Sequence, residues 1–246
     1  MVELASVVLV ARLYGVGTVS DAYYLGFAVP AMVGNAVRSI GVQVLMPWFC
    51  LTTGASERDA HLHMSQMFFA LLIPIAVLGL VAQRLAGALA PWLAGPSIDL
   101  AMLTDVLTFA LPAMGASTLW AVLAAYLNSR EAYTRAALGG LVSPACFVGA
   151  TLLLYREPSA AGLGLARLLG TLGGVAWLAF WARPSLRRLR SVGTAYHWRQ
   201  LLDLVLNSLL PSVALLGSRL GLAAERMMAG YLAVGSVAAL SYSYRL

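Results

Sequence analysis

The sequence contains no lysine, only 2 cysteines and 3 histidines, and few charges of either sign. Charged residues make up 11% of its 246 residues, whereas soluble domains have roughly 25%. Hydrophobic residues make up 61%. A chain with this composition cannot present an ordinary polar surface to water, so the composition excludes a typical soluble domain and predicts a protein that lies in a lipid bilayer.

The chain also lacks the residue patterns of metal sites and common catalytic sites. Cys50 and Cys146 lie in or at the end of apolar segments and define neither a disulfide framework nor a zinc site. His61 and His63 lie in a short polar stretch that offers too few further metal ligands. Nucleophile elbows, phosphate-binding loops and metalloprotease motifs are missing. The sequence therefore predicts no catalytic residue, no metal and no cofactor, and a protein that is not an enzyme.

The basic residues, all 16 of them arginines, give the chain a formal charge of +6. They fall mostly at the ends of apolar runs and form no basic stripe between aromatics, so we expect no nucleic-acid partner. The connections on one side of the predicted membrane carry eight arginines, and those on the other carry four, including Arg167 and Arg226. Because positive charge is retained on the cytoplasmic side, this asymmetry predicts a cytoplasmic N-terminus.

The apolar runs predict an all-α integral membrane protein, a polytopic helical bundle of about eight transmembrane helices. The predicted helices are residues 2–14, 21–50, 64–81, 103–127, 136–155, 162–181, 204–224 and 229–246. Residues 83–93 are amphipathic and are predicted to lie in the membrane interface. The first helix is too short to cross a bilayer at about 1.5 Å per residue, and the last is incomplete. We therefore expect the chain to be truncated at both ends.

One short motif occurs twice. Residues 16–20 (VGTVS) follow the first predicted helix, and residues 234–238 (VGSVA) lie in the eighth. If this echo is an internal repeat, helices one and two correspond to helices seven and eight, an organisation that many transporters share. We then expect residues 1–200 to form a first transmembrane lobe with helices one to six and a basic cytoplasmic loop at 182–200. Residues 201–246 would begin a second lobe.

Four ionisable residues within the predicted spans are candidates for a binding site, because charge inside a membrane is costly. Asp21 begins helix two, where it suits either a helix cap or a site. Arg38 lies too deep in the same helix to reach the interface easily. Arg219 suits either a membrane-interface contact or a pair with Glu225, and Arg245 lies near mid-membrane in helix eight. Arginine binds diphosphate and carboxylate groups through its planar fork, so a cavity lined by such residues predicts an anionic substrate.

Several collinear stretches carry a family resemblance. They are residues 11–17 (ARLYGVG), 20–24 (SDAYY), 27–30 (FAVP), 127–129 (LNS), Glu225-Arg226, 235–237 (GSV) and 244–246 (YRL). In this order the chain resembles the MurJ/MviN-like lipid II flippases of the multidrug/oligosaccharidyl-lipid/polysaccharide exporter superfamily. Members of that family have fourteen helices in two lobes. The resemblance implies that the chain is the N-terminal half and that a second lobe completes the full-length protein.

The resemblance also implies a function and a location. The expected function is to flip an undecaprenyl-diphosphate-linked peptidoglycan precursor such as lipid II across the bacterial cytoplasmic membrane by alternating access. The partners would be this lipid-linked glycan diphosphate and membrane lipids. By resemblance, Asp21 falls at the family's helix-two aspartate and Arg245 at its helix-eight arginine.

This sequence departs from the family pattern at two places. The helix-one arginines of the family fall near Glu3 and Ser6, and its paired basic residues after the helix-two proline are replaced by Gly34 and Asn35. Arg38 follows one helical turn later and is a candidate substitute for that pair.

Four alternatives remain open on the sequence alone. The chain can belong to an exporter of another lipid-linked polysaccharide unit, or it can be an inactive truncated remnant. A protonmotive drug exporter would place acidic residues deep in a lobe, whereas Asp21 and Asp105 lie near helix starts. A membrane-embedded transferase acting on prenyl-linked sugars would need a cluster of catalytic acidic or histidine residues, and the sequence assembles none.

Overall fold

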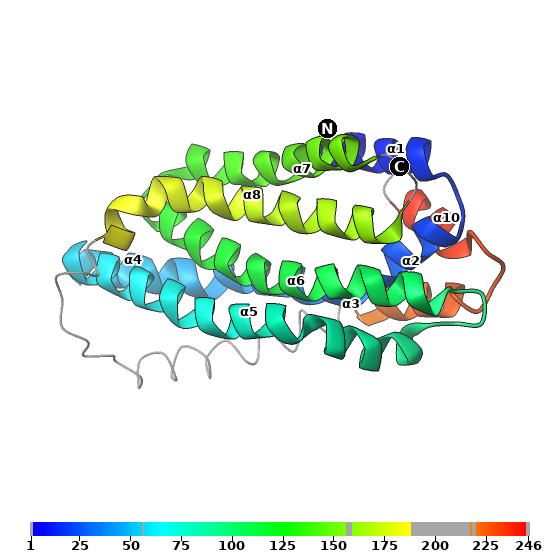
Figure 1. Cartoon of the computed structure of the whole chain (residues 1–246). Helices are drawn as coiled ribbons and strands as arrows, with labels where there is room; N and C mark the ends of the chain where they lie inside the picture. The colour runs from blue at the N-terminus through cyan, green and yellow to red at the C-terminus, as the bar shows by residue number, and fades with distance from the viewer. Residues whose placement is uncertain (1, 56, 156–158, 188–216, 218–219, 245–246) are drawn as a thin grey trace.

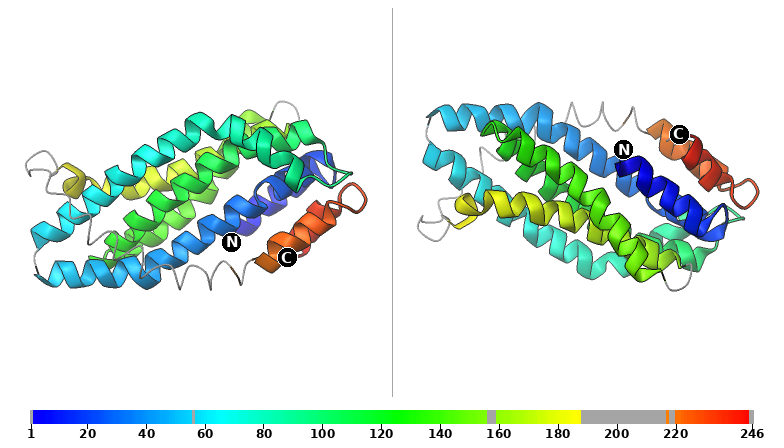
Figure 2. Two further views of the ribbon diagram at one scale, coloured as in Figure 1. Left: turned by 90° about the horizontal axis from the view of Figure 1, so that it is seen from below. Right: turned by 90° about the horizontal axis from the view of Figure 1, so that it is seen from above.

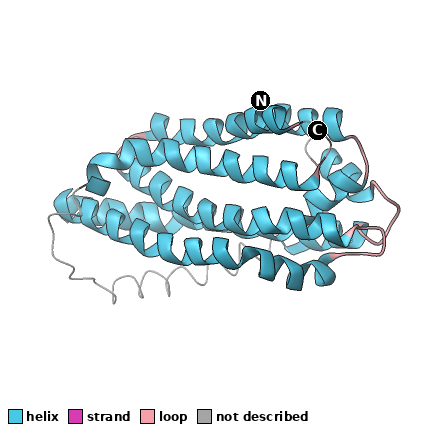
Figure 3. Cartoon of the chain, in the orientation of Figure 1, coloured by secondary structure: helices cyan, strands magenta, loops and turns pink. Residues whose placement is uncertain are grey.

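The computed structural model of the chain describes residues 2–55, 57–155, 159–187, 217 and 220–244. Within these ranges the chain consists of helices and connecting loops, without a β-strand (Figure 3). The predicted all-α fold is therefore confirmed.

The helices lie roughly side by side along one long axis, as an elongated bundle (Figures 1 and 2). They are α1 (Val2–Tyr14), α2 (Thr18–Gly26), α3 (Ala28–Ile40), η1 (Gly41–Leu45), α4 (Met46–Ala55), α5 (Glu57–Leu93), α6 (Leu100–Ser129), α7 (Tyr133–Leu154), α8 (Ala160–Arg187) and α10 (Ser236–Ser243). Residues 220–229, between α8 and α10, are also helical.

Predicted helix two is built from four consecutive helical segments, α2, α3, η1 and α4. Pro30 is the third residue of α3, in the first turn, where its missing N–H removes no intrahelical hydrogen bond. The π-helix η1 then widens the helix over five residues. Together these segments form one apolar stretch, Thr18–Leu51, long enough to cross a membrane.

Five helical stretches are long and apolar enough to cross a membrane. They are Thr18–Leu51, His63–Leu93, Leu100–Ser129, Tyr133–Leu154 and Ala160–Leu186. They correspond to predicted helices two to six. Helix α1 is too short to cross, as the sequence predicts, and most of predicted helix seven lies outside the described residues.

The structure contradicts the separate interfacial segment predicted at residues 83–93. These residues continue α5, which runs without interruption to Leu93. Ala82, Ala86 and Ala90 form a stripe of small side chains that are at most 1% exposed. Because these alanines let the helix pack closely on the bundle, the segment stays within the bundle.

Two predicted boundaries also differ from the observed ones. Helix α8 continues to Arg187, so residues 182–187 of the predicted basic loop are helical. The hydroxyl groups of Tyr126 and Ser185 share a hydrogen bond of 2.6 Å, which holds this last part of α8 against α6. The eighth helix begins at Ser236 and not at residue 229, because a turn containing Gly235 at φ 95° precedes it.

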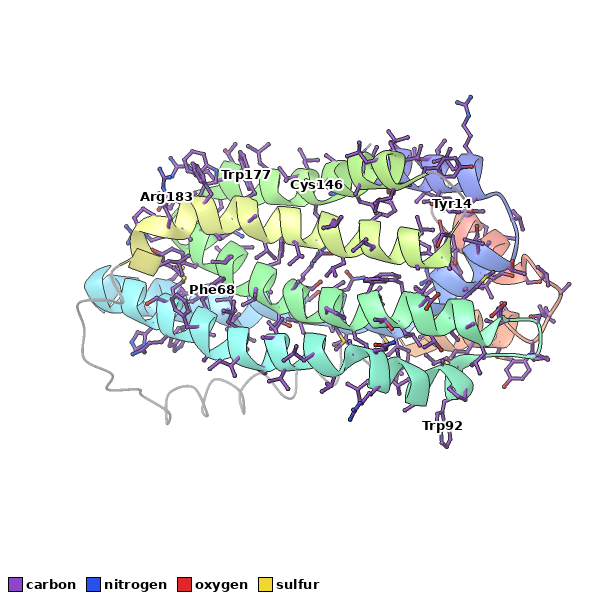
Figure 4. The ribbon with its side chains drawn as sticks, viewed as in Figure 1. Tyr14, Phe68, Trp92, Cys146, Trp177 and Arg183 are labelled. Atoms are coloured by element: carbon purple, nitrogen blue, oxygen red, sulfur yellow. The ribbon has the colours of Figure 1, made fainter. Side chains whose placement is uncertain are left out.

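Helix α6 is the centre of the bundle, and the outer helices present apolar side chains outward. In its most apolar window α6 is 67% buried, whereas α5 is 28% and α7 is 17% buried. Leu80 and Leu153 are 85% and 84% exposed. Trp92 points away from the bundle (Figure 4). Such a surface suits lipid tails, since these are as apolar as leucine.

Glycines bring α7 and α8 into close contact. A Cβ atom on Gly170 would lie 2.8 Å from the Ser143 carbonyl oxygen, and one on Gly173 would lie 2.6 Å from the Cys146 sulfur. A side chain at Gly170 would require the backbone of α7 to move, and one at Gly173 would require the Cys146 side chain to move. The two helices therefore pack backbone to backbone along this line.

Candidate functional site

Asp21 holds the start of a helix that is far away in the sequence. It lies in the first turn of α2 and is 1% exposed. Its Oδ2 accepts a hydrogen bond of 2.5 Å from the Gly235 amide, and its Oδ1 accepts one of 2.7 Å from the Ala238 amide. These amides are at the N-terminus of α10, where backbone N–H groups have no partner within the helix. A carboxylate there also has a favourable interaction with the helix dipole.

Two further hydrogen bonds join the same parts of the chain. The Tyr242 hydroxyl donates to the Gly15 carbonyl oxygen at 2.9 Å, and the Ser97 hydroxyl donates to the Gly230 carbonyl oxygen at 2.6 Å. We call the hydrogen bonds of Asp21, Ser97 and Tyr242 the clasp. The clasp lies at the end of the bundle opposite α4 (Figures 1 and 2). It connects the first predicted lobe to the start of the second.

Gly235 is required at the clasp for two reasons. Its φ of 95° is one that residues with a side chain rarely adopt. A Cβ atom at this position would also lie 2.5 Å from Cγ1 of Val16. Val16 belongs to the first copy of the short sequence echo and Gly235 to the second, so the two copies, 16–20 and 234–238, are in contact.

Arg38 lines a cavity of about 90 Å³ between α3, α6 and α8. The residue is half-buried, and its guanidinium lies over the Trp120 ring, 4.6 Å from the ring centroid. Stacking on an aromatic face stabilises an arginine away from water. The cavity is lined by Phe27, Pro30, Ala31, Gly34, Asn35, Arg38, Ala110, Ala113, Met114, Ser117, Arg167 and Thr171.

Arg167 lines the same cavity from α8. Its guanidinium lies 5.5 Å from the centroid of the Phe147 ring, which is itself 2% exposed. Counting Arg167 among the arginines of a connection is wrong, because α8 begins at Ala160, two turns before it. The predicted helix at residues 162–181 already contained Arg167, and this position is the sequence signal that identifies it.

A second cavity of about 240 Å³ lies on the other side of α3. It is lined by Ala28, Ala31, Met32, Asn35, Leu222, Ala223, Arg226 and Tyr244. Arg226 is 7% exposed and lies within helical residues 220–229, so its assignment to a connection is also wrong. The Tyr244 hydroxyl donates to the Glu225 carboxylate, which ties the end of α10 to this helical segment. Ala31 and Asn35 line both cavities, so the two cavities adjoin at α3.

The four residues predicted for the site are not all gathered in one place. Arg219 and Arg245 lie outside the described residues. Asp21 lies in the clasp and lines neither cavity. Arg38 follows it by seventeen residues of the same span, which is roughly 25 Å along a helix. The structure thus places Arg38 and Arg167 in the lining of one cavity, and Arg226 in the lining of the other.

No cluster of metal-binding side chains is present in the described part of the chain. The side chain of His63 is in edge-to-face contact with Trp48, with ring centroids 5.2 Å apart. The chemistry that this region offers is therefore recognition of an anion by arginine, next to tyrosine and amide groups.

Comparison with known proteins finds similarity to a family model and to solved structures. The family model for "Lipid II flippase MurJ" matches residues 10–246. The fold is similar to the solved structure "Lipid II flippase MurJ, inward closed conformation", with a TM-score of 0.75 and 17% sequence identity. This similarity covers 99% of the chain and 51% of the solved one, so the chain spans about half the length of that flippase. No curated protein sequence matches the chain.

Proposed function

Since the chain belongs to the MurJ lipid II flippase family, we propose that it forms part of a transporter that flips an undecaprenyl-diphosphate-linked peptidoglycan precursor, such as lipid II. Residues 1–200 constitute its first lobe, and residues 201–246 begin its second. The membrane is the bacterial cytoplasmic membrane, with the N-terminus on the cytoplasmic side and the clasp at the outer end.

The observation that carries this proposal is the pair of adjoining cavities beside α3. Arg38 and Arg167 line one, and Arg226 lines the other, in a bundle with five helical stretches apolar enough to cross a membrane. Arginine within a membrane protein is costly unless it serves a polar cavity or a partner. A diphosphate supplies negative charge and oxygen atoms in the geometry that guanidinium groups bind best. Arg219 and Arg245 are proposed to contribute further cations to this path.

The clasp supports alternating access as the mechanism. In the conformation described here it joins the two predicted lobes at the outer end through Asp21, Ser97 and Tyr242. Opening to the outside then requires these hydrogen bonds to break, so that the cavity of Arg226, which lies between α3 and residues of the second lobe, becomes accessible. Both carboxylate oxygens of Asp21 are bound to α10 amides, so Asp21 acts on the substrate by controlling this opening and contacts it only when the clasp is released.

An alternative substrate is favoured by one local feature. Gly34 and Asn35 stand where the family has paired basic residues, and both line the cavity of Arg38. A Cβ atom on Gly34 would already lie 3.2 Å from the Ser117 hydroxyl oxygen, so α3 and α6 approach each other closely here. A cavity altered at these positions suits another lipid-linked polysaccharide unit as well as lipid II.

Complementation in bacteria tests the proposal. The chain would be produced in a strain depleted of its own lipid II flippase, alone and together with a second lobe from a fourteen-helix flippase. Growth, with labelled lipid II in the outer leaflet, is the expected result. An Arg38→Ala variant present in the membrane at the same level should not support growth.

Failure of both arrangements, despite normal amounts of protein in the membrane, would reject lipid II flipping. Rescue of a strain that lacks a flippase for a different lipid-linked glycan would then identify the alternative substrate. An inactive remnant would rescue neither strain.

A further inference from the structure

The cavity of Arg38 exists because small residues face it from α6. Ala110, Ala113 and Ser117 follow one another at helical spacing on the side of α6 where α3 and α8 converge. Larger side chains on this face would fill the space between the three helices. The small residues thus leave room for two long side chains, Arg38 from α3 and Arg167 from α8.

Arg167 is the less expected of the two cations. It lies seven residues after the start of α8, about 10 Å along the helix, and therefore inside the membrane-spanning part. Among the described residues its guanidinium forms no hydrogen bond or ion pair and is in contact with the face of the Phe147 ring. A ring face stabilises a cation only weakly compared with an anionic partner.

The rest of the cavity lining is suited to an anion. The described residues that line it include two arginines and no carboxylate. The Ser117 hydroxyl donates to the Ala113 carbonyl oxygen at 3.0 Å, and the Thr171 hydroxyl donates to that of Arg167 at 3.1 Å. These hydroxyl protons are donated within their own helices, so the two arginines are the cations of the lining that can attract an anion.

The size of the cavity limits the ligand. A volume of about 90 Å³ corresponds to roughly three water molecules at about 30 Å³ each. One phosphate group fits this space, whereas a sugar or a complete diphosphate-linked glycan does not. The larger cavity of about 240 Å³ has Asn35 in its lining as well, so further space lies next to this one.

We infer that Arg167 and Arg38 form a two-arginine subsite that binds one phosphate group of a lipid-linked diphosphate. This inference rests on the proposed function and assigns to α8 a binding residue that the sequence analysis assigned to a connection. The first lobe then holds the phosphate between two helices that both pack on α6, so the pair is complete without any residue of the second lobe.

Binding to the whole chain in lipid nanodiscs tests the inference. The probes are undecaprenyl diphosphate in the bilayer and inorganic diphosphate in solution, so that a lipid source and a free anion are distinguished. We expect Arg167→Ala to weaken binding of undecaprenyl diphosphate by about 10- to 100-fold, the loss typical of a hydrogen bond to a charged group. Arg167→Lys should bind with intermediate affinity, because it keeps the charge and loses the planar fork.

Two further variants separate binding from folding. Arg84→Ala removes an exposed arginine of α5 that lines neither cavity and should bind as the unmodified chain does. Ala113→Leu fills the cavity while both arginines remain, and it should also weaken binding. Each variant is compared at an equal protein concentration. Its thermal unfolding midpoint shows whether it is as stable as the unmodified chain.

The outcomes separate the inference from the proposed function. Unchanged binding by Arg167→Ala, together with loss of binding by Arg38→Ala, would overturn the inference and leave the proposed function intact. Absence of undecaprenyl diphosphate binding by the unmodified chain would overturn both. Arg167-dependent binding of inorganic diphosphate alone would show an anion site without a lipid ligand, and would reject the lipid source.

Discussion

At the scale of single residues, the environment of each arginine decides its role. Arg12 is exposed on a short helix, whereas Arg38 is half-buried over Trp120 in a cavity. Both residues are arginines, so the side chain itself does not distinguish them. In the sequence, Arg38 differs because it lies deep within an apolar run. Arg167 lies in an equally apolar run, but nearer its start, where depth alone does not separate a helix residue from a connection.

Arg38→Lys tests whether Arg38 acts through its planar guanidinium. Lysine keeps the positive charge but presents a compact ammonium that stacks less well on Trp120 and cannot bind phosphate in a bidentate way. We expect binding of undecaprenyl diphosphate in nanodiscs to weaken by about tenfold or more. The matched variant Arg12→Lys, at an exposed position, should bind normally. Equal affinities for both variants would show that charge alone is sufficient.

At the scale of helices, contact between α7 and α8 depends on which glycines face the partner helix. Gly170 faces the backbone of Ser143, whereas Gly140 on α7 has open space where its Cβ would lie. Helical periodicity shows which glycines share one face of α7 or α8. Which of them touch the partner helix depends on where the two helices cross. The sequence therefore predicts close packing and not the particular contacts.

Gly170→Ala should destabilise the bundle, and Gly140→Ala should not. At Gly170 the added methyl group would meet the Ser143 carbonyl oxygen and the Phe147 Cβ at 2.8 Å, which costs about 1–3 kcal/mol. At Gly140 the same methyl group meets nothing within 4 Å and stabilises the helix by about 0.5–1 kcal/mol. The thermal unfolding midpoint in detergent measures both. A similar change in both midpoints would contradict this account of α7–α8 packing.

At the scale of the whole molecule, the clasp is the feature that joins distant parts of the chain. Asp21 and Gly235 are 214 residues apart in sequence and are hydrogen-bonded in the structure. The aspartate replaces a local cap, since Gly235 offers no side chain to the N-terminus of α10. The N-terminus of α10 is thus stabilised by a residue of α2.

Asp21→Asn should destabilise the clasp. Asparagine retains a single acceptor oxygen and no charge, so one charge-assisted hydrogen bond to α10 is lost, at a cost of about 1–3 kcal/mol. Asp99 makes a similar pair of bonds to Ala101 and Met102, but at the start of its own helix and exposed to solvent. Because asparagine caps about as well as aspartate there, Asp99→Asn should be nearly neutral. Thermal unfolding in detergent compares the two, and equal effects would reject the special role of Asp21.

The orientation of the bundle is a second prediction at this scale. Glu131 lies in the turn between α6 and α7, and Leu232 lies in the exposed turn before α10 at the other end. In a chain with Cys50 and Cys146 replaced by serine, a membrane-impermeant maleimide added to intact cells should label Leu232→Cys. It should label Glu131→Cys only after the membrane is opened. The reverse pattern would place the N-terminus outside.

The sequence by itself determined the features that depend on local composition and periodicity. Apolar runs of about twenty residues predicted the five helical stretches that are long enough to span a membrane, although not their bounds, because every backbone polar group in lipid must be bonded within its own helix. Hydropathy also singled out Arg38 as an intramembrane charge, and collinear motifs indicated the family that the family model then matched.

Only the tertiary structure decided which residues meet. The start of α10 at Ser236, the caps that Asp21 supplies to it, and the cavity shared by Arg38 and Arg167 all depend on how helices from distant parts of the chain lie against one another. Hydrophobicity is not directional, so it places a helix in the membrane without fixing its neighbours or its rotation. Those are set by small residues at crossings and by hydrogen bonds that exist only after the bundle has formed.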